Sequence, residues 1–179
     1  MKALMISANN FEDTEVLYPY YRIKEEGWKV DVAAPEGDRI TGKHGISVSV
    51  DKSLYDVNPK EYDLLVIPGG KAPEEVRQNK DALNIVKSFF EDDKYVAAIC
   101  HGAQVLISAG EMNGRSATCW PGIKDDVTAA GGKYRDTEVV VDGNLITSRK
   151  PDDLPAFMRE VVSVMRELSR LEEEREKAA

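Results

Sequence analysis

The chain has 179 residues, a formal net charge of -8 and a charged fraction of 31%, which fits one domain of ordinary size. The acidic balance argues against a general affinity for nucleic acid or for an anionic membrane. The apolar runs are too short to span a bilayer, the first residues enter a strand pattern without the layout of a signal peptide, and two cysteines suggest a reducing, cytoplasmic setting.

Short apolar strands alternate with amphipathic helices over the first part of the chain. The strand pattern predicts strands at 2–7, 28–34, 62–67 and 95–99. Helical spacing predicts helices at 15–26, 73–77, 81–92 and 101–109. Asp13 or Thr14 is expected to cap the first helix. A hairpin is predicted over 39–50 with its turn at Gly42 to Gly45, and 51–60 is expected to be irregular.

The pattern changes after Gly110. A short strand at 116–119, a short helix at 123–130 and a hairpin of 138–141 with 145–147 are predicted. A last helix is expected to begin at Asp152 or Asp153, and its end, 170–179, contains mostly charged residues and alanine. We expect that end to fray or to form a solvated helix. The predicted organisation is one domain over 1–168 and a charged helical tail over 169–179.

This alternation predicts an α/β fold with a mostly parallel sheet and helices on both faces. Sites in such sheets form at the carboxyl ends of the strands. Three of the predicted strands end in loops that carry reactive or flexible residues, at 9–13, 68–74 and 100–102. We expect these loops to converge.

Cys100 is the candidate nucleophile. It lies between an apolar strand and a helix, in the sequence Ala98-Ile99-Cys100-His101-Gly102. A cysteine on such a turn lies beside unpaired N–H groups and the positive end of the helix dipole, which favour a thiolate. The pattern predicts a nucleophile elbow, although the first glycine of the usual G-x-nucleophile-x-G signature is missing. The alternative is a buried cysteine that ends a core strand.

Residues on the other loops can support this chemistry. A protonated Glu12 would donate a hydrogen bond to the sulfur and lower the pKa of the thiol. The N–H groups of Gly69, Gly70 and His101 are candidates for binding an oxyanion. His101 can act as a base if an acceptor orients it, and Trp120 can form a wall of the cleft. Each residue also has an ordinary interpretation. Glu12 would be an acid that is stabilised at the start of a helix, and Gly69-Gly70 would form a tight turn. His101 would be an exposed histidine, and Trp120 a packed aromatic residue.

No metal site or other cofactor is expected. The two histidines, His44 and His101, have no metal-ligand spacing with Cys100 and Cys119. His44 is interpreted as an exposed loop residue. The two cysteines can pair in principle, but a thiol role is the preferred interpretation for a protein in a reducing compartment.

Four motifs together resemble the PfpI family of intracellular cysteine peptidases. They are Asn10-Phe11-Glu12-Asp13, Val66-Ile67-Pro68-Gly69-Gly70, Ala98-Ile99-Cys100-His101-Gly102 and Pro121-Gly122-Ile123-Lys124-Asp125-Asp126. That family belongs to the class I glutamine-amidotransferase-like superfamily, which includes glyoxalase-III and protein-deglycase members. The resemblance implies a flavodoxin-like three-layer sandwich with a nucleophile elbow.

The resemblance also implies roles for individual residues. Cys100 would be the nucleophile, His101 its catalytic histidine and Glu12 the protonated partner of the sulfur. Gly70 and His101 would supply the N–H groups of the oxyanion hole. The segment Lys71 to Arg77 matches the one that offers a glutamate to a neighbouring subunit, with Glu74 at that position and Glu75 beside it as the alternative. The active site would then require a homo-oligomer, a dimer or a hexamer.

Three functions are compatible with these residues. The first is a cysteine peptidase that acts on small peptides through Cys100 and His101. The second is a glyoxalase III or protein deglycase, in which Cys100 adds to a 2-oxoaldehyde such as methylglyoxal or to its adducts. The third is a redox-sensing stress protein or a holdase without turnover. The residues named above serve the first two equally well.

Overall fold

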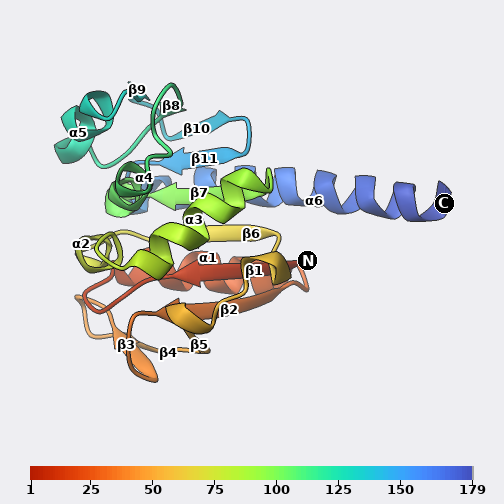
Figure 1. Ribbon diagram of the computed structural model, residues 1–179, viewed down its shortest axis with the longest axis horizontal. Coiled ribbons are helices and arrows are strands. Elements are labelled where there is room, and N and C mark those ends of the chain that lie inside the picture. Colours follow the sequence, from red (N-terminus) through yellow and green to blue (C-terminus); the bar gives the residue numbers. More distant parts are fainter. Residues whose placement is uncertain (179) are drawn as a thin grey trace.

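A mostly parallel sheet of seven strands forms the centre of the molecule in this computed structural model, which describes residues 1–178 (Figure 1). The strand order is β10-β11-β7-β6-β1-β2-β5. All neighbours pair in parallel except β10 and β11, which form an antiparallel hairpin. The strands are β1 (Lys2–Ile6), β2 (Lys29–Ala34), β5 (Lys52–Ser53), β6 (Leu64–Ile67), β7 (Tyr95–Ile99), β10 (Val139–Asp142) and β11 (Leu145–Ser148).

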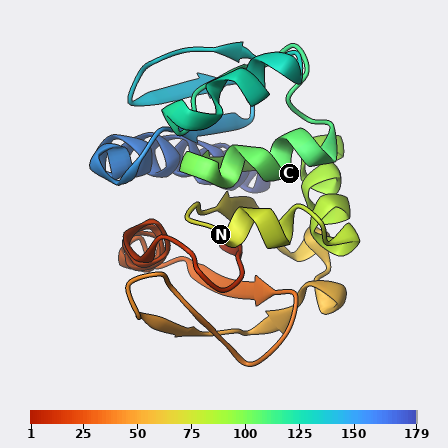
Figure 2. The same cartoon turned by 90° about the vertical axis from the view of Figure 1, so that its left-hand side faces the viewer.

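Helices cover both faces of this sheet (Figures 1 and 2). α1 and α6 pack together on one face, and α3 and α4 pack together on the other. The helices are α1 (Asp13–Glu25), α2 (Ala72–Val76), α3 (Lys80–Glu91), α4 (Ala103–Ala109), α5 (Lys124–Ala129) and α6 (Leu154–Ala178). The predicted α/β sandwich with a parallel sheet is confirmed.

Burial explains why these segments fold as they do. β6 has no exposed residue, and neither has β11, so both read as continuous apolar or small-residue runs. α3 buries one stripe, which consists of Ala82, Ile85, Val86 and Phe89. Its first turn is capped by Asn79, whose side chain accepts hydrogen bonds from the N–H groups of Asp81 and Ala82.

Smaller elements complete the chain. The predicted hairpin over 39–50 is confirmed as β3 (Arg39–Thr41) and β4 (Ser47–Ser49), which form a separate two-stranded sheet. β8 (Ser116–Ala117) and β9 (Lys133–Tyr134) form another. Single 3-10 turns are found at η1 (Leu54–Asp56), η2 (Pro59–Glu61), η3 (Cys100–Gly102), η4 (Pro121–Ile123) and η5 (Pro151–Asp153).

Some local expectations need correction. α1 begins at Asp13 rather than at residue 15, and its N-cap is Glu12, which makes no capping hydrogen bond through its side chain. The segment 51–60, which we expected to be irregular, contains an edge strand and two 3-10 turns. Among residues 1–178, no helix combines the length and the apolar character that crossing a membrane requires.

The end of α6 remains helical and projects away from the sheet (Figure 1). Arg170 pairs with Glu167 and Glu174, one turn away on either side. These pairs are exposed, and exposed pairs of this kind contribute little to stability. The described part of this end, residues 170–178, forms an exposed helix, which is one of the two alternatives that we considered.

We predict that truncation after Arg170 leaves the fold almost unchanged in stability. The expected loss is below about 1 kcal/mol, because only solvated helix and exposed ion pairs are removed. The control is Phe157→Ala on the same helix; Phe157 is fully buried, so this change should cost about 3–5 kcal/mol. Urea unfolding measures both, and a truncation as costly as Phe157→Ala would place the tail inside the cooperative domain.

Candidate active site

Cys100 occupies a strained turn between β7 and α4. Its backbone φ is +61°, a conformation that residues other than glycine rarely adopt. The turn is also tight, because a Cβ on Gly102 would lie 2.3 Å from the carbonyl oxygen of Ile67. Only glycine fits at 102, so the elbow is held against the end of the neighbouring strand β6. This is the geometry of the predicted nucleophile elbow.

The three strand-end loops converge, as predicted. They surround a cavity of about 450 Å³ that Cys100 lines. The cavity is lined by Glu12, Glu15, Lys43, Gly70, Lys71, Glu74, Cys100, His101, Trp120 and Pro151. Every predicted site residue except Gly69 is among them.

Glu15, not Glu12, is the carboxyl beside the sulfur. It lies in the first turn of α1, is fully buried, and accepts a hydrogen bond from the Gly69 N–H at 2.8 Å through Oε2. A Cβ on Gly69 would lie 2.5 Å from this oxygen and 2.8 Å from the Cβ of Cys100. The Glu15 carboxyl and Cys100 therefore both lie against Gly69. The expected partner of the sulfur is corrected from Glu12 to Glu15.

The pKa of Glu15 is raised to about 7 by burial, and the hydrogen bond from the Gly69 N–H acts in the opposite direction by lowering it. Its second oxygen, Oε1, is buried with no hydrogen-bond partner among the described residues. A buried carboxylate oxygen without a donor is costly, whereas a protonated carboxyl carries its own donor. The site therefore favours a proton on Glu15 near neutral pH.

Two opposing influences act on the Cys100 thiol. Burial, and then the charge of Glu15, raise its pKa, while the N–H groups of His101 and Gly70 act in the opposite direction. The repulsion disappears when Glu15 carries the proton. A neutral Glu15 thus removes one of the causes that raise the pKa of the thiol, while burial, the largest cause, still keeps the thiol protonated in the resting site.

The N–H groups around the sulfur differ in what they can bind. The Gly69 N–H is already donated to Glu15, so it is not free to bind an oxyanion, which corrects one expectation. Those of Gly70 and His101 face Cys100. Gly70 has a φ of +80°, and a Cβ there would lie 2.3 Å from the backbone nitrogen of Glu12. A side chain at position 70 would therefore displace the loop before α1.

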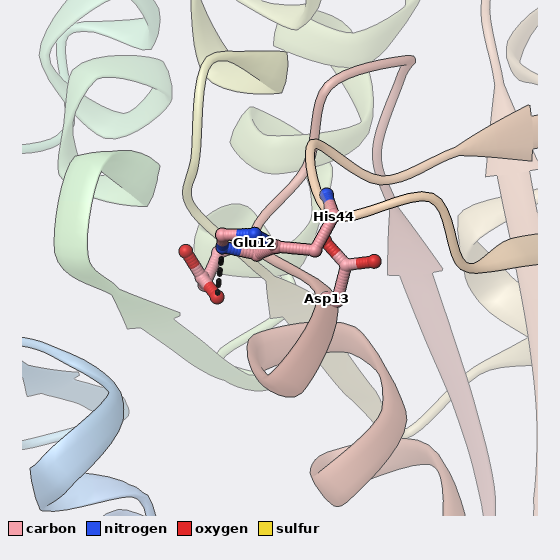
Figure 3. Close-up of side chains that lie close together, drawn as sticks. All are labelled: Glu12, Asp13 and His44. Carbon is pink, nitrogen blue, oxygen red and sulfur yellow. Dashed lines mark hydrogen bonds and ion pairs between the residues drawn. The ribbon is translucent and has the colours of Figure 1, made fainter.

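Glu12 faces the entrance of the cavity rather than the sulfur. Its carboxylate forms an ion pair with the Lys43 ammonium at 2.5 Å and lies 3.7 Å from Nε2 of His44. Figure 3 shows Glu12 and His44 pointing toward each other, with Asp13 to one side of them at the start of α1. Glu12 keeps its place in the site, but its neighbours are the Lys43 ammonium and the His44 ring of the β3–β4 hairpin.

The ligand atoms of Glu12, Asp13 and His44 lie within 4.8 Å of one another, as those of a cation site would. Their existing partners explain the grouping without a cation. The two oxygens of Asp13 accept the N–H groups of His44 and Ile46, at 2.9 Å each, and Glu12 is neutralised by Lys43. These side chains join the hairpin to α1.

His101 lies beside both the sulfur and Trp120. Its Nδ1 is 3.3 Å from Sγ of Cys100, and the Trp120 ring stacks on it with centroids 6.0 Å apart and an angle of 24° between the planes. Burial lowers the pKa of His101, while the negative charge of Glu74 acts in the opposite direction. The imidazole is therefore mainly neutral at pH 7, as a base must be.

Glu74 lines the same cavity from within the same chain. No hydrogen bond joins it to His101 in the part of the chain that the structure describes. The prediction that a glutamate of a neighbouring subunit orients His101 is not tested by one chain and stays a prediction. Cys100 and Cys119 are unpaired, and the buried Cys119 thiol donates to the carbonyl oxygen of Trp120 at 3.3 Å.

Comparison with known proteins identifies the family. The family model described as "DJ-1/PfpI family" matches residues 1–164. This chain belongs to the DJ-1/PfpI family. It is 55% identical over 166 residues to "Deglycase PH1704" of Pyrococcus horikoshii, covering 93% of this chain and 100% of that protein. It is 40% identical over 166 residues to "Putative cysteine protease YraA" of Bacillus subtilis, covering 92% and 98%.

A solved structure confirms the fold. The crystal structure of a two-domain protein of Anabaena variabilis, with DJ-1/ThiJ/PfpI-like and ferritin-like domains, superposes with a TM-score of 0.90 at 38% identity. The match covers 92% of this chain and 50% of that one. The predicted resemblance to PfpI proteins and the flavodoxin-like fold are therefore confirmed.

We predict that Glu15→Gln stabilises the protein above neutral pH. The folded-state pKa of Glu15 is raised to about 7 from 4.5, so the folded state holds a proton that the unfolded state releases between these values. Wild-type stability should therefore fall as pH rises from about 4.5 to 7. Glutamine keeps an acceptor for the Gly69 N–H and removes this loss, so the variant should gain about 1–3 kcal/mol at pH 8.

The measurement is urea unfolding of both proteins at pH 5 and pH 8. Glu12→Gln is the matched control, since Glu12 lies at the cavity entrance and is paired with Lys43. An advantage of Glu15→Gln that is equal at the two pH values would show that Glu15 is ionised throughout.

Proposed function

We propose that this protein is a cysteine-dependent deglycase that removes 2-oxoaldehyde adducts of the methylglyoxal type. The observation that carries the proposal is the arrangement around Cys100: a strained nucleophile, a buried carboxyl with a pKa near 7 and two converging N–H groups. These groups supply attack on a carbonyl carbon, a proton for the resulting oxygen and stabilisation of its charge. Both cysteines are free thiols, which supports the proposal of a reducing, cytoplasmic setting.

The chemistry can be followed through named atoms. Sγ of Cys100 attacks the aldehyde carbon of methylglyoxal as the thiol proton passes to Nδ1 of His101, 3.3 Å away; a C–S bond forms, and the carbonyl oxygen takes a proton from Glu15. Glu15, now ionised, moves a proton from the first carbon to the oxygen of the neighbouring carbonyl, which gives an enediol. Transfer of the proton of the hydroxyl on the first carbon to the second carbon then gives the thioester. Water then cleaves the C–S bond and releases lactate and the thiol. When the substrate is an amine adduct, Cys100 displaces the protonated amine and the same hemithioacetal forms.

The size of the cavity supports a small electrophile. Its volume is about 450 Å³, and Trp120, Lys43 and Glu74 stand around the sulfur. A ligand of a few heavy atoms fits such a space, while a polypeptide in extended conformation needs an open groove. Relatives that match this chain over their full length at 54–55% identity are named deglycases.

A cysteine peptidase, our first expectation from the sequence, is the second candidate. Contact between His101 and Cys100 at 3.3 Å favours it, because acyl transfer from an amide needs a base that later protonates the leaving amine. The Bacillus subtilis relative carries the name of a cysteine protease. For this activity we propose a homo-oligomer in which Glu74 of one copy orients His101 of another.

We predict that the two activities respond differently to substitutions. Lactate release from methylglyoxal and from methylglyoxal-treated N-acetylarginine should be lost in Cys100→Ala and reduced at least tenfold in Glu15→Gln, which removes one proton-transfer group. Glu12→Gln, the control at the cavity entrance, should have a smaller effect. Fluorogenic peptides are assayed in parallel. Peptide cleavage by the wild type that is lost in Cys100→Ala, without lactate release, would reject the deglycase in favour of the peptidase.

We also predict complementation between subunits if Glu74 acts in trans. Cys100→Ala lacks the nucleophile and Glu74→Gln lacks the acceptor, so a mixture of the two, denatured and refolded together, should form some sites with both groups intact. Recovery of about a quarter of wild-type peptide hydrolysis is expected for random mixing in dimers. Glu75→Gln mixed with Cys100→Ala is the control. No recovery above the sum of the separate variants would place the role of Glu74 within its own chain.

A further inference from the structure

The turn of the β3–β4 hairpin is fastened to the start of α1 by one buried carboxylate. Asp13 is 5% exposed. Its Oδ2 accepts the N–H of His44 and its Oδ1 accepts that of Ile46, each at 2.9 Å. Two hydrogen bonds to a charged acceptor, both with backbone donors on one turn, hold that turn in a single position.

Two further contacts fix the same turn. The Lys43 N–H donates to the carbonyl oxygen of Phe11 at 2.9 Å. Gly42 lies directly on the Asp13 carboxylate, because a Cβ at this position would be 2.5 Å from its Cγ. The turn therefore rests on the loop that leads from β1 into α1, which is one of the three loops that form the cavity.

This attachment determines where the Lys43 ammonium lies. Lys43 lines the cavity and pairs with Glu12 at its entrance. Its charge acts on Glu15 and His101, and the charge of Cys100 acts on it. A cation that lines the cavity of a nucleophile attracts anionic groups and stabilises negative charge that develops there, and the Glu12 carboxylate, which is paired with Lys43, offsets part of this effect.

We propose that Asp13 is a positioning residue that holds the hairpin turn so that Lys43 gives the Cys100 site a preference for substrates with an anionic oxygen beside the attacked carbon. The inference rests on the proposed role of Cys100 as nucleophile, but not on which substrate it turns over. Asp13 touches no reacting atom and acts through Lys43.

A purely structural role of Asp13 is the competing explanation. An acid in the first turn of a helix is stabilised by the helix dipole in any case. Loss of such a contact would loosen the fold and slow every reaction of Cys100 equally. Loss of a positioned cation would change reactions with anionic reagents more than those with neutral ones, so the selectivity for charge separates the two roles.

The test compares alkylation of Cys100 by iodoacetate and by iodoacetamide, in which the sulfur forms a bond to carbon and releases iodide. The two reagents differ in charge at nearly equal size. Second-order rate constants are measured at one fixed pH by mass spectrometry of the Cys100 peptide, which excludes a contribution from Cys119. The ratio of the iodoacetate rate constant to the iodoacetamide rate constant measures how strongly the Lys43 charge favours an anionic reagent.

Lys43→Met should lower this ratio by about fivefold, the size expected for one charge at short range in a partly solvated site. Asp13→Asn should lower it nearly as much with Lys43 intact. The matched control is Asp142→Asn, since Asp142 also accepts a backbone N–H, that of Ser116 at 2.6 Å, outside the cavity. Its ratio should equal that of the wild type.

Gly42→Ala provides an independent variant if Asp13→Asn folds poorly. The added methyl group collides with the Asp13 carboxylate and should lower the ratio similarly. The proposal is overturned if Asp13→Asn and Gly42→Ala slow both reagents in equal proportion, or if Lys43→Met leaves the ratio unchanged. Absence of deglycase turnover would reject the proposed function and would leave the alkylation ratio interpretable.

Discussion

The site depends on the left-handed backbone of Cys100, and the fold holds that conformation in place. A residue other than glycine at this φ costs about 1–3 kcal/mol, and it persists only where the surroundings determine it. Here β7 is paired with β6 and β11 up to the turn, and Gly102 brings the next residues against the Ile67 carbonyl oxygen. The buried sheet therefore supplies the energy that keeps the sulfur at the carboxyl edge, facing two N–H groups.

A buried carboxyl is the second costly feature, and it explains how a buried thiol can react. Glu15 and Cys100 are two acids in one apolar region, so the two cannot both ionise without strong repulsion. Because the pKa of Glu15 is about 7, its carboxyl can carry a proton near neutral pH, and the repulsion that would oppose negative charge on the sulfur is then absent. Glu12 has different surroundings, because its carboxylate forms an ion pair with Lys43.

The sequence allowed the elbow and the convergence of its loops to be predicted, because strand ends and glycines are local signals. It did not point to Glu15, although a signal was present. Glu15, Pro19 and Ile23 are spaced four residues apart and all face the core, so the acid stands on the buried side of α1, where a structural acid is rarely found. Asp13 was expected to cap that helix; its partners lie 31 and 33 residues away, a distance that no local pattern reveals. The strand within 51–60 has only two residues and no periodicity to detect.

The two candidate reactions need different parts of this site. Addition of the thiol to an aldehyde requires a nucleophile, a proton for the new alkoxide and N–H groups to stabilise it, and one chain contains all three. Cleavage of an amide also requires that a base return its proton to a poor leaving group, for which His101 must be held in one orientation. Its Nδ1 faces the sulfur, and within residues 1–178 no hydrogen bond from the ring to a carboxylate fixes its orientation. Adduct removal therefore fits the site that one subunit forms, whereas peptide cleavage would depend on what assembly adds to it.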